Sequence, residues 1–544
     1  MSNIFSKKKA RLSISSSAFI ILISLYFGFV LNYPVVDKLI TLAAETGDGY
    51  FAYSSPLLLS AAFAIIFSLF TWPFITKPFF ILLVSSSAMA SFATLQYGVI
   101  FDYSMIENIF ETNTGEALSY VNLSSIGFSV VFGVIPSILI ALVSFDRSAS
   151  LKVRIIKRVA VIIGAVVVIS AIYLSSYKEY ASVGRNNSYL NQLIVPTHIF
   201  NSVKYVDRTY FTEPLEYKII GEDATAMTAE NNKPLLVVLI VGETARSANI
   251  NYNGYERNTN PYTENQGIIS IQDVSSCGTA TAHSLPCMFS NLNRKGYNKL
   301  RANSQDNALD IIQRAGVKVL WKENDGGDKA VAKNINNLLI TPSENPEYCG
   351  SIYCFDEVML KNFDQEISEN QNSNQLFAFH IIGSHGPTYW KRYPKEKELF
   401  TPSCNQSDIE NCSDEEIVNV YDNTIAYTDF VISETIKKLE SYKEEYNVAL
   451  MYISDHGESL GENGLYLHGT PYALAPEEQT KIPWFLWMDA SFEQAYNIDR
   501  QCVEEKAQKG GFSHDNLFHT LIDFSAVTTS AINPEMSIIA SCRD

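Results

Sequence analysis

Residues 234–246 read PLLVVLIVGETAR, and this stretch decides the fold. Its proline is followed by seven aliphatic residues without any polar alternation. An uninterrupted apolar run of this length is typical of a strand that is buried on both faces of a parallel sheet. The run ends at Gly242 and Glu243, a flexible residue and a carboxylate. Because ligands bind beyond the carboxyl ends of parallel strands, we expect Glu243 to lie in a functional site.

Four further apolar runs predict further buried parallel strands, at residues 317–321, 376–382, 448–453 and 482–487. Between two of them, residues 417–442 have the pattern of a long helix. Strands that alternate with helices indicate an α/β domain with a mostly parallel sheet.

Polar clusters directly follow three of these predicted strands. They read KENDGGDK at residues 322–329, GSHGP at 383–387 and SDHGE at 454–458. Since the carboxyl ends of parallel strands share one edge of a sheet, these clusters should meet Glu243 there. A single cluster would be weak evidence for a site, but several that converge are much stronger.

Glu243, Asp455 and His456 are the first candidates for metal ligands. Carboxylate oxygens combined with an imidazole nitrogen suit zinc or manganese rather than calcium, which takes oxygen ligands only. A lone Asp-His pair is more often structural. The convergence of the polar clusters favours the metal site here.

His385 and His468 form a second tier of candidates, which could hold a second metal ion or bind phosphate. Lys329 could bind a phosphate oxygen as a point charge. The remaining histidines have no comparable sequence context and are expected to be structural: His198, His380, His514 and His519.

The segment SCGTATAHSLPC at residues 276–287 is the other dense feature. Small residues surround two threonines. A helix that begins near Thr281 would direct backbone N–H groups towards an anion. Metal coordination can convert a threonine hydroxyl into a nucleophile. The alternative is that the threonines only cap a helix.

All eight cysteines lie after residue 276. The tight CxxC pairs of thiolate zinc sites are absent, so disulfides in an oxidising compartment fit better. The expected pairs are Cys277 with Cys287, Cys349 with Cys354, Cys404 with Cys412 and, as the remainder, Cys502 with Cys542.

Five apolar, uncharged stretches are long enough to cross a membrane, near residues 18–36, 53–75, 78–100, 124–145 and 159–175. We favour an uncleaved anchor over a signal peptide for the first stretch. The expected organisation is a transmembrane domain over residues 1–175, a bridging segment over 176–217 and a catalytic domain over 218–544. The bridging segment suits a membrane surface by its aromatic content, or is an ordinary linker.

Charge sets the expected orientation of these spans. Basic residues precede the first span and separate the fourth from the fifth, whereas residues 101–123 contain four acidic residues and no Lys or Arg. The positive-inside rule therefore places the N-terminus in the cytoplasm and the C-terminal domain outside. The formal net charge of −17 argues against a general nucleic-acid binder, which would show a basic face.

These motifs together resemble the phosphoethanolamine transferases that modify lipid A, including the mobile colistin-resistance enzymes, within the alkaline phosphatase and sulfatase superfamily. The resemblance extends over nearly the whole chain. Its most specific stretches are residues 241–246, 276–289, 383–387, 454–464 and 465–471.

The resemblance implies roles for individual residues. Zinc would be held by Glu243, Thr281, Asp455 and His456, with Thr281 as the catalytic nucleophile that carries phosphoethanolamine. Residues implied to bind substrate are Asn108, Thr112, Glu116, Asn324, Lys329, His385 and His468, of which the two histidines could instead hold a second zinc ion.

The implied reaction is the transfer of phosphoethanolamine from phosphatidylethanolamine to a phosphate group of lipid A. The enzyme would be a monomer in a Gram-negative inner membrane with its catalytic domain in the periplasm. The product would lower the negative charge of the envelope and give polymyxin resistance.

Three alternatives stay open at this point. The acceptor could lie in the lipopolysaccharide core, the reaction could be that of a glycerol-phosphate polymerase, or the chain could be an inactive membrane sensor or scaffold. One departure from the resembled family is clear. Members often carry cysteines that flank the lysine matching Lys329, and here those positions are Asp328 and Ala332. The loop that holds Lys329 is therefore expected to be looser.

Overall fold

The computed structural model describes residues 13–45, 49–112, 114–146, 150–187, 189–350 and 353–543. The chain divides into two compact units. The helical unit contains residues up to Tyr103 together with Val121–Val206, and the sheet unit contains Ser104–Tyr120 together with Asp207–Asp544. The expected bridging segment, residues 176–217, is therefore divided between the two units at Val206.

The helical unit contains apolar helices of membrane-spanning length. Four qualify within the described residues, and a bent helix pair would make a fifth span. The four are Gly49–Phe70, which includes α3 (Ser55–Phe70), α4 (Thr76–Tyr97), Leu123–Leu142, which includes α7 (Leu123–Ser129) and α8 (Ile135–Leu142), and α9 (Leu151–Asn186).

The first predicted span is not one straight helix. Ser16–Leu31, which includes α1 (Ser16–Tyr26), and Tyr33–Ala44, within α2 (Tyr33–Glu45), meet at an angle of 56°. Asn32 lies at the break. Its backbone N–H and its side-chain amide both donate to the Phe27 carbonyl at 3.0 Å, and the same amide donates to Val195 at 3.0 Å. A polar side chain that bonds to the preceding turn ends the first helix there.

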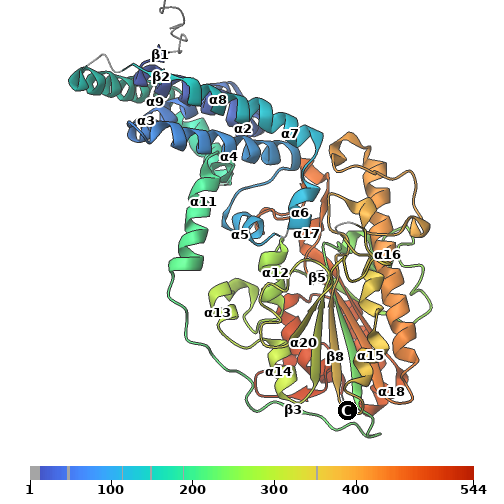
Figure 1. The fold of residues 1–544 in the computed structure, drawn as a ribbon. Coiled ribbons are helices and arrows are strands. Elements are labelled where there is room, and N and C mark those ends of the chain that lie inside the picture. Colours follow the sequence, from blue (N-terminus) through green and yellow to red (C-terminus); the bar gives the residue numbers. More distant parts are fainter. Residues whose placement is uncertain are drawn as a thin grey trace, which may run out of the picture. The chain divides into compact units, whose positions relative to one another are not determined.

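The sheet unit is built on a seven-stranded sheet with the order β5-β12-β9-β4-β8-β6-β7. Four of the predicted strands are β4 (Leu235–Gly242), β6 (Lys318–Glu323), β8 (Gln375–His380) and β9 (Asn447–Ser454), and they are parallel to their neighbours within this set. Figure 1 shows the sheet between two layers of helices. Helices α14 (Ala308–Arg314) and α20 (Leu517–Phe524) pack on the face that presents Val237 and Leu239.

The prediction of a parallel strand at residues 482–487 is wrong in direction. The strand there, β12 (Lys481–Met488), is antiparallel to both β9 and β5. The chain leaves β9 at the carboxyl edge of the sheet and stays at that edge until it enters β12 through the short helix α17 (Glu477–Thr480). Without a crossover helix to return it to the other edge, the strand must run backwards.

Two strands at the edges of the sheet escaped the sequence analysis. They are β5 (Ile269–Ser275), which contains Gln272 and Asp273, and β7 (Asn336–Leu339), which is exposed along its length. Edge strands bury less of their surface than central strands, so neither shows a continuous apolar run.

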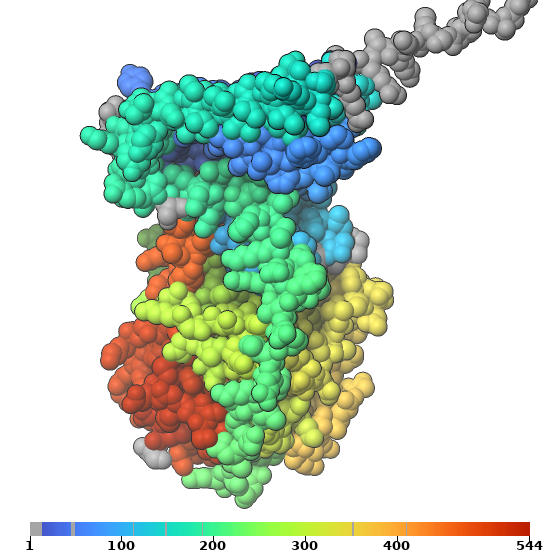
Figure 2. Space-filling view, turned by 90° about the vertical axis from the view of Figure 1, so that its left-hand side faces the viewer, coloured from blue at the N-terminus to red at the C-terminus, as the bar shows by residue number. Residues whose placement is uncertain are grey.

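Disulfides, a capped helix and an extended surface segment lie around the sheet. All four predicted disulfides are present, and they join Cys277 to Cys287, Cys349 to Cys354, Cys404 to Cys412 and Cys502 to Cys542. The long helix α16 (Asp414–Glu440) begins at a capping box between Ser413 and Glu416. The extended residues 212–224 lie along the surface of the sheet unit (Figure 2), where Lys218 donates its backbone N–H to Ser304.

Candidate active site

Four candidate metal ligands from three separate segments meet at the carboxyl edge of the sheet. Glu243 follows β4, Asp455 and His456 follow β9, and Thr281 begins helix α12 (Thr281–Met288). The Thr281 hydroxyl donates to Glu243 Oε2 at 3.0 Å and lies 3.3 Å from His456 Nε2. His456 Nε2 in turn lies 3.2 Å from Asp455 Oδ2. The structure thus brings together all four residues that the resemblance implies as zinc ligands.

Unsatisfied atoms in this cluster fit a bound cation. Glu243 Oε1 and Asp455 Oδ2 are fully buried and have no hydrogen-bond donor among the described residues. Burial, and then the negative charge of Asp455, raise the pKa of Glu243 well above its ordinary value. Two carboxylates that face each other without a counter-charge are costly in a protein interior. With the imidazole, they form an oxygen and nitrogen donor set that suits zinc.

The position of Thr281 bears on whether its hydroxyl acts as a nucleophile or only caps a helix. It is the first helical residue of α12, and the preceding Ala280 provides no side-chain cap. The Thr281 hydroxyl faces Glu243 and His456 instead of the backbone of its own helix. The disulfide between Cys277 and Cys287 spans this turn. The geometry therefore favours the chemical interpretation of Thr281.

A second cluster consists of Glu116, His385 and His468, whose ligand-type atoms lie within 4.8 Å of one another. His385 Nε2 lies 3.4 Å from Glu116 Oε1, and His468 Nδ1 lies 2.9 Å from Glu458 Oε2. Burial would raise the pKa of Glu116, but the adjacent His385 outweighs it and the pKa falls to about 2. The His468 ring centroid is 4.7 Å from that of His456, so this cluster adjoins the first one.

Other predicted substrate residues lie around these clusters. Lys329 Nζ donates to the carbonyl of Glu111 at 3.0 Å. Thr112 donates to the carbonyl of Asn108 at 2.7 Å and lies 3.4 Å from Glu116 Oε1. The acidic loop 101–123 thus contributes its residues 104–120 to the same compact unit as the sheet.

The side chain of Asn324 is held by two hydrogen bonds. Its side-chain N–H groups donate to the Cys354 carbonyl at 3.1 Å and to Asp356 Oδ1 at 2.8 Å. Asp356 is fully buried and also accepts the backbone N–H groups of Ile382 and Gly383. The amide nitrogen of Asn324 is therefore occupied, and its carbonyl oxygen remains as the group that it can offer a ligand.

Two further residues near Glu243 were not among the candidates predicted from the sequence. His380, expected to be structural, and Asp325 each place a ligand-type atom within 4.8 Å of Glu243 and of each other. His380 Nδ1 is 2.8 Å from Glu323 Oε2, and burial is outweighed by Glu323 so that the pKa of His380 rises to about 9. The sequence offered a partial indication of both residues, because Asp325 and His380 lie near the carboxyl ends of predicted strands.

In the loop that holds Lys329, hydrogen bonds link Asp328 and Ala332, the two positions at which members of the resembled family often carry cysteines. Asp328 Oδ2 accepts the backbone N–H of Ala332 at 2.7 Å, and the Asp328 carbonyl accepts the N–H of Val331 at 2.8 Å. These hydrogen bonds close the same turn that a disulfide between the two positions would close. Lys329 itself has a positive φ of 44°.

Lys299 connects the segment 104–120 to helix α12, which begins at Thr281. Its ammonium donates to both carboxylate oxygens of Glu111 at 2.8 and 2.9 Å and to the Ala282 carbonyl at 2.8 Å. It also lies 3.6 Å from Glu107. Ala282 directly follows Thr281, so one side chain fixes helix α5 (Tyr103–Glu111) against the first turn of α12.

Lys299→Met is therefore expected to loosen residues 104–120. Each charge-assisted hydrogen bond contributes about 1.5–3 kcal/mol to the stability of the folded state, and this contribution is lost with the ammonium group. Amide hydrogen exchange in this segment of the full-length protein should accelerate about tenfold or more, which corresponds to about 1.4 kcal/mol. Lys299→Arg, which keeps the charge, is the matched control. Unchanged exchange in Lys299→Met would show that Lys299 does not hold the segment.

Comparison with known proteins agrees with this arrangement. Residues 236–526 match the family described as Sulfatase, and residues 59–210 match the family described as Phosphoethanolamine transferase EptA/EptB. The chain is 34% identical over 542 residues to phosphoethanolamine transferase EptA of Escherichia coli K12, with 98% of each chain covered. It is 32% identical over 520 residues to phosphatidylethanolamine transferase Mcr-1 of Escherichia coli, with 93% of this chain and 92% of the relative covered.

A solved structure is similar over the whole chain. The integral membrane protein lipooligosaccharide phosphoethanolamine transferase A (EptA) from Neisseria meningitidis has a TM-score of 0.92 and 36% identity. The match covers 98% of this chain and 99% of that chain.

Proposed function

This chain belongs to the EptA/EptB family of phosphoethanolamine transferases, and from this premise we propose that it transfers phosphoethanolamine from phosphatidylethanolamine to a phosphate group of lipid A. The name of Mcr-1, a phosphatidylethanolamine transferase, supports the donor. The name of another relative, a Kdo(2)-lipid A phosphoethanolamine 7''-transferase, supports a lipid A-containing acceptor but not the position that is modified. The observation that carries the mechanism is the convergence of Thr281, Glu243, Asp455 and His456 at one buried point.

The first half of the reaction loads Thr281. Its oxygen forms a bond to the phosphorus of phosphatidylethanolamine, the bond from phosphorus to the glycerol oxygen breaks, and diacylglycerol leaves with a proton. Glu243 Oε2 accepts the hydrogen bond of the Thr281 hydroxyl and is placed to take its proton. In the second half, a lipid A phosphate oxygen forms a bond to the same phosphorus, the bond from phosphorus to the Thr281 oxygen breaks, and that oxygen takes up the proton that the acceptor phosphate loses.

Zinc is the proposed cofactor, held by Glu243, Thr281, Asp455 and His456. When bound, it would supply positive charge that activates the hydroxyl and stabilises the phosphoryl oxygens. His385, His468 and Lys329 are proposed to bind the substrate phosphate, together with Asn108, Thr112 and Glu116 on the donor side. A second zinc at His385 and His468 remains the alternative role of those histidines.

The cellular location of the protein is part of the same proposal. The chain is a membrane protein, and we propose a Gram-negative inner membrane with the N-terminus in the cytoplasm and the sheet unit in the periplasm. Four disulfides support an oxidising compartment. Masking lipid A phosphates with phosphoethanolamine would weaken the binding of cationic peptides, and hence we propose polymyxin resistance as the consequence.

Mass spectrometry of lipid A tests the proposed function. Gram-negative cells that express the chain should contain lipid A with an added phosphoethanolamine, and cells that express Thr281→Ala at equal levels should not. Modified core oligosaccharide with unmodified lipid A would instead assign the acceptor to the core. No added phosphoethanolamine in either fraction, with well-expressed protein, would contradict the proposal.

A further inference from the structure

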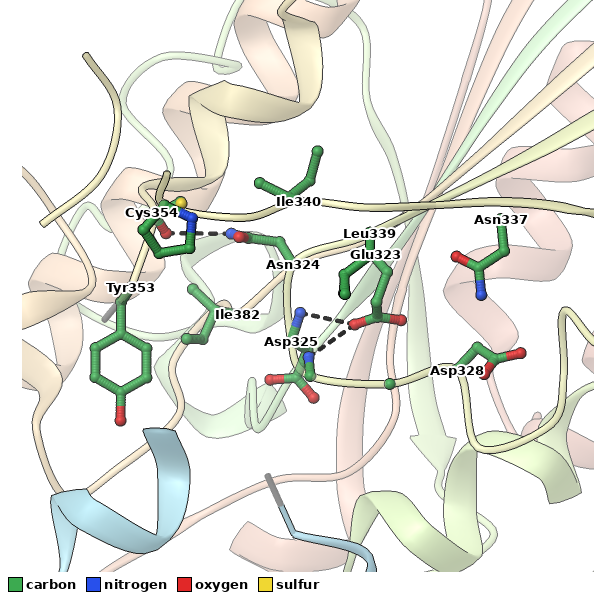
Figure 3. Close-up of a pocket in the computed structure, with 13 residues that line it drawn as sticks. Glu323, Asn324, Asp325, Asp328, Asn337, Leu339, Ile340, Tyr353, Cys354 and Ile382 are labelled. Carbon is green, nitrogen blue, oxygen red and sulfur yellow. Dashed lines mark hydrogen bonds between the residues drawn. The ribbon is translucent and has the colours of Figure 1, made fainter. Parts of the chain in front are cut away.

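A pocket of about 600 Å³ opens beside the active site, and it is acidic. Figure 3 shows the polar side chains that line it. Glu323 ends β6, Asn324, Asp325 and Asp328 follow in the next loop, Asn337 lies in β7, and Tyr353 comes from a separate loop. No Lys or Arg is among the described residues that line it. The lining therefore offers a phosphate group no Lys or Arg, whereas its carboxylate and amide oxygens are acceptors for an ammonium group.

The wall nearest to Glu243 offers acceptors rather than donors. Asn324 has its N–H groups bonded to Cys354 and Asp356, which leaves its carbonyl oxygen for a ligand. Glu323 is already satisfied by His380, by the Trp321 indole N–H at 2.9 Å and by two backbone N–H groups. Asp325 lines the pocket and also places a carboxylate oxygen within 4.8 Å of Glu243.

Thr281 and Asp325 both lie close to Glu243, and the length of the headgroup is compatible with a contact to both. Thr281 Oγ1 is 3.0 Å from Glu243 Oε2, and a carboxylate oxygen of Asp325 lies within 4.8 Å of one of Glu243. Five single bonds separate the Thr281 oxygen from the amine nitrogen of a bound phosphoethanolamine, a span of about 6 Å when extended. A charge-assisted hydrogen bond of about 2.8 Å completes the reach to Asp325.

We propose that Asp325, with the carbonyl oxygen of Asn324, binds the ammonium group of the phosphoethanolamine headgroup and makes the enzyme selective for an amine-bearing donor. This inference rests on the proposed function. In this arrangement the site has one part that binds the negative phosphate and another that binds the positive ammonium group of the zwitterionic headgroup. The phosphate end lies towards Thr281, His385 and His468, and the ammonium end lies in the acidic pocket.

His380 acts as a positioning residue for this contact. Its Nδ1 is fixed by Glu323, and its Nε2 lies 3.7 Å from Asp325 Oδ2. The backbone N–H of Asp325 also donates to Glu323 Oε1 at 2.8 Å. The Asp325 side chain is only 8% exposed, so its orientation is set by packing as well as by these partners. A pre-oriented carboxylate loses little entropy when the amine binds.

A pair of lipid donors tests the proposal. Full-length protein is assayed in vesicles that contain lipid A and either phosphatidylethanolamine or phosphatidylethylene glycol, in which a hydroxyl replaces the ammonium. Diacylglycerol release gives kcat and KM for each donor. The wild-type protein should prefer the amine donor by at least about tenfold in kcat/KM, because a buried charge partner contributes that much or more.

Asp325→Asn should raise KM for the amine donor by at least about tenfold, with little change for the neutral donor, so that the preference largely disappears. Asp328→Asn is the matched control, since this carboxylate lines the same pocket but bonds to Ala332. It should keep the wild-type preference. The rate with the neutral donor reports in each variant whether the site is intact.

Equal use of both donors by the wild-type protein would overturn the proposal, even if Asp325→Asn failed to fold. A full amine preference in Asp325→Asn would overturn it as well. Both results leave the proposed function standing, provided that the wild-type protein transfers from phosphatidylethanolamine. Absence of any transfer from phosphatidylethanolamine would contradict the proposed function itself.

Discussion

Thr281→Ala should abolish phosphoethanolamine transfer, with a loss of at least about 10⁴-fold in rate, as is typical when a covalent nucleophile is removed. The Thr281 hydroxyl is the proposed nucleophile, the group that forms a bond to phosphorus and later releases it. It lies within hydrogen-bonding distance of both Glu243 and His456. Alanine keeps the helix and removes only the oxygen and a methyl group.

Mass spectrometry of the purified protein measures the same prediction directly. After incubation with phosphatidylethanolamine and no acceptor, the peptide that contains Thr281 should carry phosphoethanolamine in the wild-type protein. Thr281→Ser is the matched control, since it keeps a hydroxyl and should form the adduct at a reduced rate. An adduct on another residue, or undiminished transfer by Thr281→Ala, would disprove the assignment of the nucleophile.

Removal of the metal should have the second largest effect. Glu243 Oε1 and Asp455 Oδ2 are buried acceptors without a donor among the described residues, so the cluster needs a counter-charge. Treatment with a chelator should abolish activity and lower the thermal midpoint by several degrees. A cation present at 100 times its dissociation constant stabilises the fold by about 2.7 kcal/mol.

Zinc should restore both properties, and magnesium should not, because magnesium prefers near-octahedral oxygen ligands. Asp455→Asn should contain much less metal by elemental analysis and should not be rescued by added zinc, since the amide neither carries the charge nor replaces the ligand. Full metal content in Asp455→Asn, or full activity after chelation, would show that these residues do not hold the cofactor.

How well the site could be predicted depended on where each residue lies along the chain. Glu243, Asp455 and His456 follow long apolar runs, so the rule for parallel sheets places them at one edge. Lys299 had no such signal. Its role depends on Glu111 and Ala282, which lie 188 and 17 residues away in the sequence. Contacts of this kind exist only once the chain has folded.

The sequence alone determined the buried strands β4, β8 and β9, the three closely spaced disulfide pairs and the candidate ligands, because apolar runs and short spacings are local properties of the chain. The tertiary structure decided the reversed direction of β12, the place of residues 104–120 beside the sheet, and the proximity of Asp325 to Glu243. These features arise from pairings between distant segments. Burial and hydrogen bonding select such pairings together, and no single stretch of sequence encodes them.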